Sequence, residues 1–225
     1  LGAEFADTPL TAALTPQQLV SVIRLDEVLF ADAWGPPQND MDIVRGIGGA
    51  NYLRTVGNFR GQGVRGEVLD GGFLLTHVDF QTPAPLGHTS NSSDTYHGTS
   101  TYGIVFGKGV GNATGTGMLP GAEQGIYGVY TGLTDRYTHT AQLVDPALNY
   151  KAVFQSNSWG GALTTAYTTL SSQMDDIILR TDLLICQSQS NMGTTSSRPQ
   201  AWAKNIVSVG AVQHQNTPAR TDDRV

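Results

Sequence analysis

The stretch GVRGEVLDGG at positions 63–72 decides the fold, because it has the form of a short buried strand that ends in an acid and a glycine turn. Residues 65–69 are strand-like, and Asp70 closes the strand just before Gly71 and Gly72. An acid at the tip of a buried strand has few neighbours to solvate it. Taken alone, Asp70 is more often a residue that caps the next turn, so a functional role depends on what surrounds the strand.

Strand-like and helix-like segments alternate through the rest of the chain. We expect strands at residues 125–130, 152–155, 183–187 and 206–209, the last of them buried, and helices at residues 100–106, 140–148 and 165–180, with a brief helical turn at 202–205. This alternation predicts right-handed β-α-β units and an α/β fold with a mostly parallel, doubly wound sheet. In such sheets the chemistry gathers beyond the carboxyl ends of the strands, where Asp70, Ser158 and Asn191 lie.

The first 40 residues differ from the rest. Thr15 and Pro16 predict a helix start, and residues 28–34 resemble a short strand that is broken by Gly35, Pro36 and Pro37. We therefore expect residues 1–40 to form a small helix–strand unit with a linker, separate from a main domain at residues 41–225. The alternative is an ordinary amino-terminal arm of the main domain.

Composition excludes several classes of protein. The chain has 225 residues and a net charge of −6, the wrong sign for binding a phosphate backbone. No apolar run is long enough to span a membrane. Cys186 is the only cysteine, which excludes an internal disulfide framework and a CxxC metal site.

Few charges, many glycines and a lone cysteine are common in exported proteins, so we expect an extracellular location. Because the sequence starts at Leu1 without Met or a signal sequence, we expect the chain to be a processed or trimmed piece of a longer protein.

Two further polar residues have settings that suit chemistry. His97 lies in DTYHGTSTYGI (residues 94–104) at a helix start, where small neighbours leave room for another backbone or a substrate. A helix amino end disfavours an imidazolium unless a carboxylate compensates. Asn191 follows a buried strand and precedes a glycine turn, so its amide can face a cleft or stabilise its own turn. The other histidines, at positions 77, 88, 139 and 214, have no comparable setting and are interpreted as surface or structural residues.

The segment SNSWGG at positions 156–161 offers free backbone groups to which an extended peptide could add as a strand. Its simpler interpretation is a tight turn that leads into the helix expected from residue 165.

In this order and spacing the segments resemble the subtilisin-like serine proteases (subtilases). The family's strand ending in Asp-Thr/Ser-Gly is matched at Asp70, with Gly71 in place of the hydroxyl residue. Its His-Gly-Thr-His-x-x-Gly helix is matched by residues 97–103, with Ser100 for the second His. Residues 117–122 approximate the family's Gly-x-Ala-Pro segment, and residues 158–160 approximate its substrate-binding strand. Residues 190–193 approximate its Ala-Gly-Asn-x-Gly turn, and residues 203–211 approximate the strand that follows this turn. Each motif is weak alone, but their succession from about residue 42 to residue 225 is specific.

The resemblance implies a serine endopeptidase with an Asp-His-Ser triad and helices on both faces of the sheet. Asp70 would orient His97, His97 would act as the general base, and Asn191 would stabilise the oxyanion. Ser158, Trp159 and Gly160 would hold the backbone of a protein or peptide substrate. The resemblance implies no cofactor for catalysis, and residues 15–34 resemble the end of a subtilase propeptide.

The family's nucleophile motif, Gly-Thr-Ser-x-Ala-x-Pro, is absent. Gly98-Thr99-Ser100 belongs to the His97 helix and lacks the Pro, so we expect the serine beyond Val225, in a carboxyl-terminal remainder. The chain alone is then expected to be inactive and its sheet incomplete at the carboxyl end. Gly71, Trp159 and Ser190 depart from the family pattern and leave open a catalytically inactive module that binds extended peptides. A third interpretation is an unrelated α/β binding domain.

No metal site is expected, because no His/Cys/Glu cluster has ligand spacing. Subtilases often hold structural Ca²⁺ through loop oxygens, but the loop acids Asp79, Asp94 and Asp135 do not make up a recognisable site.

Overall fold

The computed structural model describes residues 12–28, 31, 41–215 and 217–224. The chain divides into two units, Leu1–Gln38 and Asn39–Val225. In the first unit, helix α1 (Pro16–Val22) begins with a capping box, in which Gln18 N–H donates to the Thr15 hydroxyl and Thr15 N–H donates to Gln18 Oε1. The helix start predicted at Thr15 and Pro16 is confirmed. Most of the strand expected at residues 28–34 lies outside the described residues.

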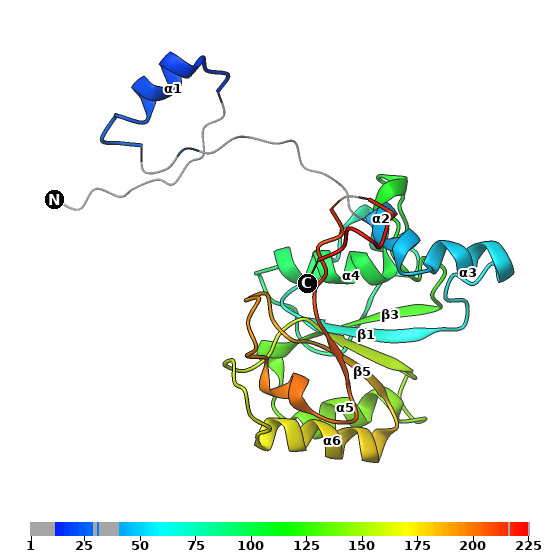
Figure 1. Ribbon diagram of the computed structural model, residues 1–225. Helices are drawn as coiled ribbons and strands as arrows, with labels where there is room; N and C mark the ends of the chain where they lie inside the picture. Colours follow the sequence, from blue (N-terminus) through cyan, green and yellow to red (C-terminus); the bar gives the residue numbers. More distant parts are fainter. Residues whose placement is uncertain (1–11, 29–30, 32–40, 216, 225) are drawn as a thin grey trace. The chain divides into compact units, whose positions relative to one another are not determined.

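The second unit is built on a six-stranded, all-parallel sheet with strand order β2-β3-β1-β4-β5-β6 (Figure 1). The strands are β1 (Arg65–Asp70), β2 (Leu86–Gly87), β3 (Gln124–Val129), β4 (Phe154–Asn157), β5 (Leu184–Ser188) and β6 (Val207–Val209). The predicted α/β fold with a parallel sheet is confirmed. Since β1 lies between β3 and β4, Asp70 ends a central strand of the sheet.

Helices cover both faces of this sheet (Figure 1). The helices of this unit are α2 (Met41–Ile47), α3 (Ala50–Gly57), α4 (Tyr96–Phe106), α5 (Arg136–Val144) and α6 (Thr169–Thr181), with single 3₁₀ turns at Val78–Phe80, Ala113–Gly115, Tyr130–Gly132 and Pro199–Trp202. Helix α4 packs on the face that carries Val68 of β1, and α5 and α6 pack on the face that carries Ile126 of β3. Because strand side chains alternate, Val68 of β1 faces α4 whereas Glu67 of β1 faces α5. All described helices are too short or too polar to cross a membrane.

Several helix boundaries differ from the sequence expectation. Helix α4 starts at Tyr96, so His97 lies inside its first turn. Helix α5 starts four residues early, at Arg136, because the Asp135 carboxylate caps it by accepting the Thr138 N–H at 2.7 Å. The turn expected at residues 202–205 is instead a 3₁₀ turn at Pro199–Trp202.

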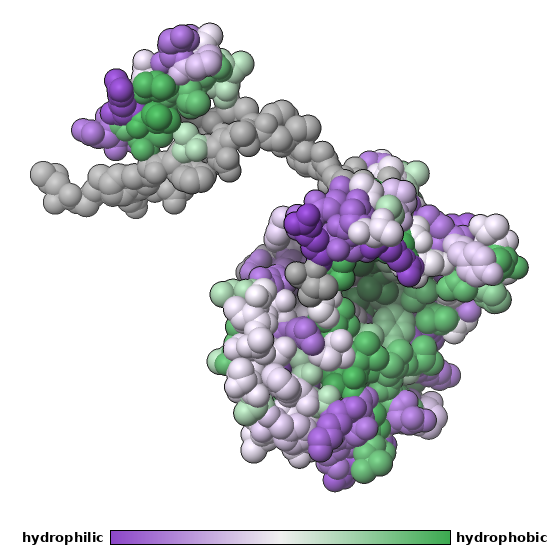
Figure 2. Space-filling view, viewed as in Figure 1, coloured by the Kyte–Doolittle hydropathy of each residue, from purple (hydrophilic) through white to green (hydrophobic). Residues whose placement is uncertain are grey.

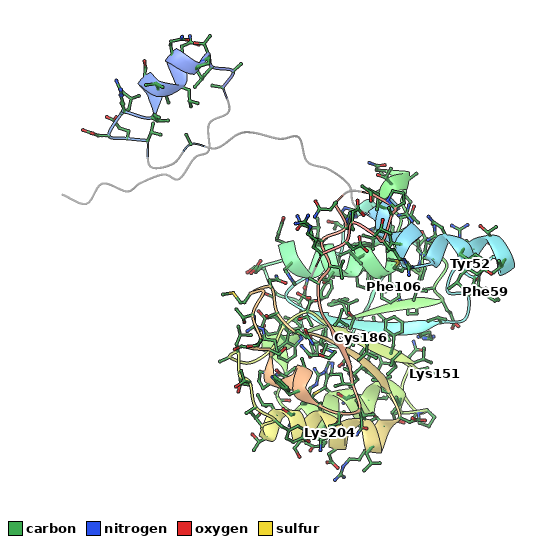
Figure 3. All side chains as sticks on the ribbon, viewed as in Figure 1. Tyr52, Phe59, Phe106, Lys151, Cys186 and Lys204 are labelled. Carbon is green, nitrogen blue, oxygen red and sulfur yellow. The ribbon has the colours of Figure 1, made fainter. Side chains whose placement is uncertain are left out.

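Helices α2 and α3 were not predicted, because glycines interrupt the apolar pattern of this segment. Gly49 (φ 83°) precedes α3 and Asn58 (φ 51°) ends it, both in the left-handed region. Tyr52 and Phe59, at either end of α3, are 68% and 62% exposed (Figure 3).

The prediction that the last strand is buried is wrong. Strand β6 pairs only with β5, and Val207 and Val209 are each 45% exposed. An edge strand lacks a neighbour on one side, and its burial depends on what else packs there rather than on its own apolar pattern. Hydrophobic residues also gather elsewhere on the surface of this unit (Figure 2).

Candidate active site

Asp70 is a buried carboxylate with three hydrogen-bond donors. It ends β1 and is 1% exposed. Its Oδ1 accepts the Gly71 N–H at 2.6 Å and lies 2.6 Å from His97 Nδ1, while its Oδ2 lies 3.1 Å from the Thr101 hydroxyl. A buried carboxylate needs such partners, because an unpaired charge in the interior is costly. Asp70 thus both caps its own turn and holds a histidine.

His97 combines one buried contact with an accessible ring. Its side chain is 57% exposed, although Nδ1 is held by Asp70. A carboxylate accepts but does not donate, so the contact assigns the ring proton of neutral His97 to Nδ1. The lone pair is then on Nε2, which can take a proton from an incoming group.

Gly98 allows α4 to approach the end of β1. A Cβ atom at Gly98 would lie 2.4 Å from the Gly72 carbonyl oxygen and 2.9 Å from that of Gly71. The expectation that small residues after His97 make room for another backbone is confirmed. This close approach places His97 beside Asp70.

Replacing Gly98 by Ala is expected to destabilise the fold by about 1–3 kcal/mol, because the new methyl group would overlap backbone atoms that cannot rotate away. Thermal melting measures this loss. Gly103→Ala on the same helix is the matched control, since its Cβ would meet Phe80 at an ordinary 3.7 Å. That variant should be neutral or slightly more stable, because Ala favours a helix. Equal melting temperatures for the two variants would contradict the close approach.

Asn191 lies in an exposed bend just after β5. Its side chain makes no hydrogen bond to the described residues, and the local turn is instead held by Ser190, whose hydroxyl accepts the Met192 N–H at 3.3 Å. Ser190 does not adopt a positive φ, so its replacement of the family's glycine causes no backbone strain there. The Asn191 amide is therefore free to bind another group.

Residues 158–160 follow β4 and are fixed by neighbouring side chains. The Trp159 ring stacks on Tyr130, with centroids 5.0 Å apart and planes at 21°, and the Arg136 guanidinium lies 5.6 Å from its centroid. Gln187 of β5 donates its side-chain N–H to the Trp159 carbonyl. Gly160 packs closely, since a Cβ there would lie 2.8 Å from Arg198 Cβ.

The strand order brings the carboxyl ends of β1, β4 and β5 next to one another, so Asp70, Ser158 and Asn191 follow three neighbouring strands at one edge of the sheet. Among the described site residues, only Asp70 and His97 are in direct contact. The roles assigned to Asn191 and to residues 158–160 stay predictions.

Two of the loop acids considered for calcium already have partners. Asp79 accepts backbone N–H groups from Gly109, Val110 and Gly111 at 2.7–3.2 Å, and Asp135 caps α5. Structural calcium stays an expectation.

Sequence reasoning missed two features. Thr101 contacts Asp70 and lies one helical turn after His97, so its i+4 spacing could have identified it. Glu67, His88 and His139 form a buried cluster on the opposite face of the sheet, although they are up to 72 positions apart in the chain. His88 and His139 were interpreted as surface or structural residues, and the structure places both in the interior beside a carboxylate, which no sequence pattern indicated.

Comparisons with known proteins agree on the fold. The family model described as the subtilase family matches residues 61–222. No curated protein sequence matches the chain. The structure is similar to that of the prenylagaramide maturation protease PagA, with 22% identity, a TM-score of 0.57, and coverage of 76% of this chain and 62% of that one.

Two further structures are similar. A mutant of the protease domain of PatA has 23% identity and a TM-score of 0.53, with coverage of 71% of this chain and 62% of that one. MycP1 from Mycobacterium smegmatis has 16% identity and a TM-score of 0.50, with coverage of 76% of this chain and 49% of that one. The chain thus spans less than two thirds of the length of each. At these identities the likeness concerns the fold.

Proposed function

Because the chain belongs to the subtilase family, we propose that it supplies the general base, its carboxylate partner and the oxyanion donor of a serine endopeptidase. The observation that carries this proposal is the 2.6 Å contact between His97 Nδ1 and the buried Asp70 carboxylate. This contact leaves Nε2 of the exposed His97 ring free to accept a proton from a hydroxyl group.

The reaction follows from this arrangement. His97 Nε2 takes the proton of a serine hydroxyl while the serine oxygen bonds to the carbonyl carbon of the substrate. Asp70 stabilises the imidazolium that forms. His97 then gives the proton to the leaving amine as the C–N bond breaks, and water hydrolyses the acyl-enzyme by the same steps. These groups need no cofactor for the proton transfers.

Asn191 and residues 158–160 complete the proposed site. The free amide of Asn191 donates to the oxygen that becomes negative when the carbonyl is attacked. The extended segment after β4 pairs with the backbone of the substrate, as an added strand does. The substrates are therefore proteins or peptides in extended form.

We propose that the nucleophile is a serine that follows Asn191 in the encoded protein and lies outside residues 1–225. The family's serine motif is absent from these residues. Ser100 belongs to α4 and donates its hydroxyl hydrogen to the Tyr96 carbonyl at 3.0 Å. The low charge content supports export to the extracellular space, and the capped helix α1 supports residues 1–40 as the end of a propeptide.

Labelling with a fluorophosphonate tests the proposal. The 225-residue chain should not react, because it has a base but no nucleophile, whereas the full encoded protein should be labelled at one serine beyond Val225. His97→Ala in the full protein is the control and should abolish labelling. Stoichiometric labelling of the 225-residue chain at Ser100 or Ser158 would contradict the assignment, and an unreactive full protein would favour the peptide-binding module.

A further inference from the structure

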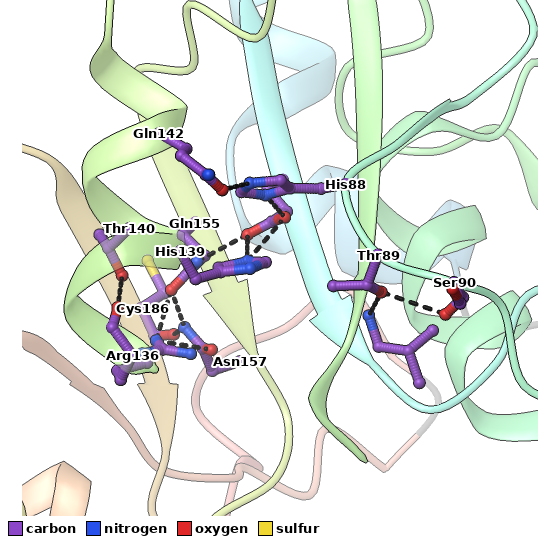
Figure 4. A network of polar contacts seen from close by, with 12 residues as sticks. His88, Thr89, Ser90, Arg136, His139, Thr140, Gln142, Gln155, Asn157 and Cys186 are labelled. Atoms are coloured by element: carbon purple, nitrogen blue, oxygen red, sulfur yellow. Dashed lines mark hydrogen bonds and ion pairs between the residues drawn. The ribbon is translucent and has the colours of Figure 1, made fainter. Parts of the chain in front are cut away.

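Glu67, His88 and His139 form a second polar cluster, on the face of β1 opposite to Asp70. His88 and His139 are seen in Figure 4. Glu67 belongs to β1, His88 follows β2, and His139 belongs to α5. Their side chains are 0%, 1% and 6% exposed. Since Glu67 and Asp70 are three residues apart on one strand, they point to opposite faces of the sheet. The proposed proteolytic mechanism does not use this cluster.

The two imidazoles converge on the Glu67 carboxylate. His88 Nδ1 lies 2.7 Å from Oε1, and His139 Nε2 lies 3.1 Å from Oε1 and 3.0 Å from Oε2. The rings are stacked with centroids 3.8 Å apart. One ligand atom from each of the three residues lies within 4.8 Å of the other two.

Neighbouring amides orient these ligand atoms. Gln155 Nε2 donates at 2.6 Å to Glu67 Oε2, which His139 Nε2 also approaches at 3.0 Å, whereas His88 Nδ1 contacts Oε1. His88 Nε2 lies 3.0 Å from Gln142 Oε1 (Figure 4). Glu67 Oε1 is an acceptor, so what joins it to His88 Nδ1, 2.7 Å away, is either a ring proton on Nδ1 or a metal ion. With Nδ1 bound to a metal, the ring proton of neutral His88 lies on Nε2 and is donated to Gln142 Oε1.

We propose that Glu67, His88 and His139 form a buried binding site for a divalent transition metal ion, with Zn²⁺ as the best match. Two imidazole nitrogens and one carboxylate oxygen are typical zinc ligands, whereas Mg²⁺ and Ca²⁺ prefer oxygen alone. In a tetrahedral zinc site the ligand atoms are about 3.3 Å apart, so the nitrogen–oxygen distances of 2.7 and 3.1 Å need to open slightly. The stacked rings, whose planes meet at 26°, also need to turn so that both lone pairs face the ion.

The positive charge of Arg136 is held away from the ligand atoms. The Arg136 guanidinium bonds to the far end of Gln155, so one amide separates it from the ligands.

The ion would join three parts of the fold. It would link β1, the segment after β2 and helix α5 behind the sheet, so its expected role is structural. Binding to the folded state alone would raise the melting temperature, which should increase with the logarithm of the free zinc concentration once this exceeds Kd.

Zinc titration of the metal-stripped 225-residue chain tests this proposal, with no need for proteolytic activity. We expect one Zn²⁺ per chain by elemental analysis and calorimetry, and a melting temperature that rises with Zn²⁺. Co²⁺ should give visible absorption bands of a tetrahedral site, which zinc should remove. Chains that take up no stoichiometric metal and melt equally with and without Zn²⁺ would overturn the proposal, and the cation would then be a proton.

Variants locate the site. Glu67→Gln keeps the shape of the side chain and should abolish stoichiometric binding, while Gln142→Ala should weaken affinity by about 10–100-fold, as loss of a partner that orients a ligand does. His97→Ala is the matched control, because it removes the other carboxylate-bound histidine and should leave zinc binding unchanged. If His97→Ala abolishes binding and Glu67→Gln does not, the metal site proposed here is wrong.

Discussion

Replacing Asp70 by Asn is expected to lower kcat of the full encoded protease by about 10⁴-fold while the fold persists. The Asn amide would donate to His97 Nδ1 and so place the ring proton on Nε2, the nitrogen that must accept the serine proton. Because Asp70 Oδ1 contacts both the Gly71 N–H and His97 Nδ1, an amide nitrogen there would lose the Gly71 hydrogen bond, whereas the oxygen at the Oδ2 position could still accept the Thr101 hydroxyl. Turnover of a chromogenic peptide measures the loss, and a melting curve checks the fold.

Thr101→Val is the matched control for this experiment. It removes the hydroxyl that lies 3.1 Å from Asp70 Oδ2 but keeps the carboxylate and its 2.6 Å contact with His97. Its kcat should fall far less than that of Asp70→Asn. If Asp70→Asn turns over at the wild-type rate, Asp70 only caps its turn, and the catalytic role assigned to it is wrong.

Replacing Asn191 by Ala in the full protein should lower kcat by about 10²–10³-fold, or roughly 3–4 kcal/mol of transition-state stabilisation. KM and the melting temperature should hardly change, because Asn191 is exposed and makes no hydrogen bond to the described residues. In a peptide-binding module no oxyanion forms, so the same change would alter affinity slightly or not at all.

The neighbouring Met192, 64% exposed in the same bend, provides the control for Asn191. Met192→Ala removes a larger side chain from the loop but no hydrogen-bond donor, so kcat should stay close to the wild-type value. If Asn191→Ala keeps full kcat, the amide is not the oxyanion donor. A large fall in melting temperature for Asn191→Ala would instead show a structural role in the bend.

The sheet could be predicted from the sequence because its central strands are short apolar runs set between turns. Strands β1, β3 and β5 lie within a residue or two of their expected positions. The pattern failed where burial depends on partners distant in the chain. Strand β6 has an apolar sequence but an edge position, and α2 and α3 were hidden by glycines at their boundaries.

The candidate active site could be predicted in part. Asp70 and His97 were identified from motifs and from their order, and the structure brings them together. Thr101 was missed although it follows His97 at helical spacing. The cluster of Glu67, His88 and His139 could not be found, because parallel pairing of β1, β2 and β3 assembles it from residues with no periodic relation.

The two faces of β1 also limit how this protein can change in evolution. Glu67 faces α5 and Asp70 faces α4, so only Val68 and Leu69 separate residues that serve opposite sides of the sheet. Side chains alternate along a strand, so one residue inserted or deleted between them would turn either Glu67 or Asp70 to the wrong face. Natural variants are therefore expected to tolerate length changes in the surface loops but none within these two positions.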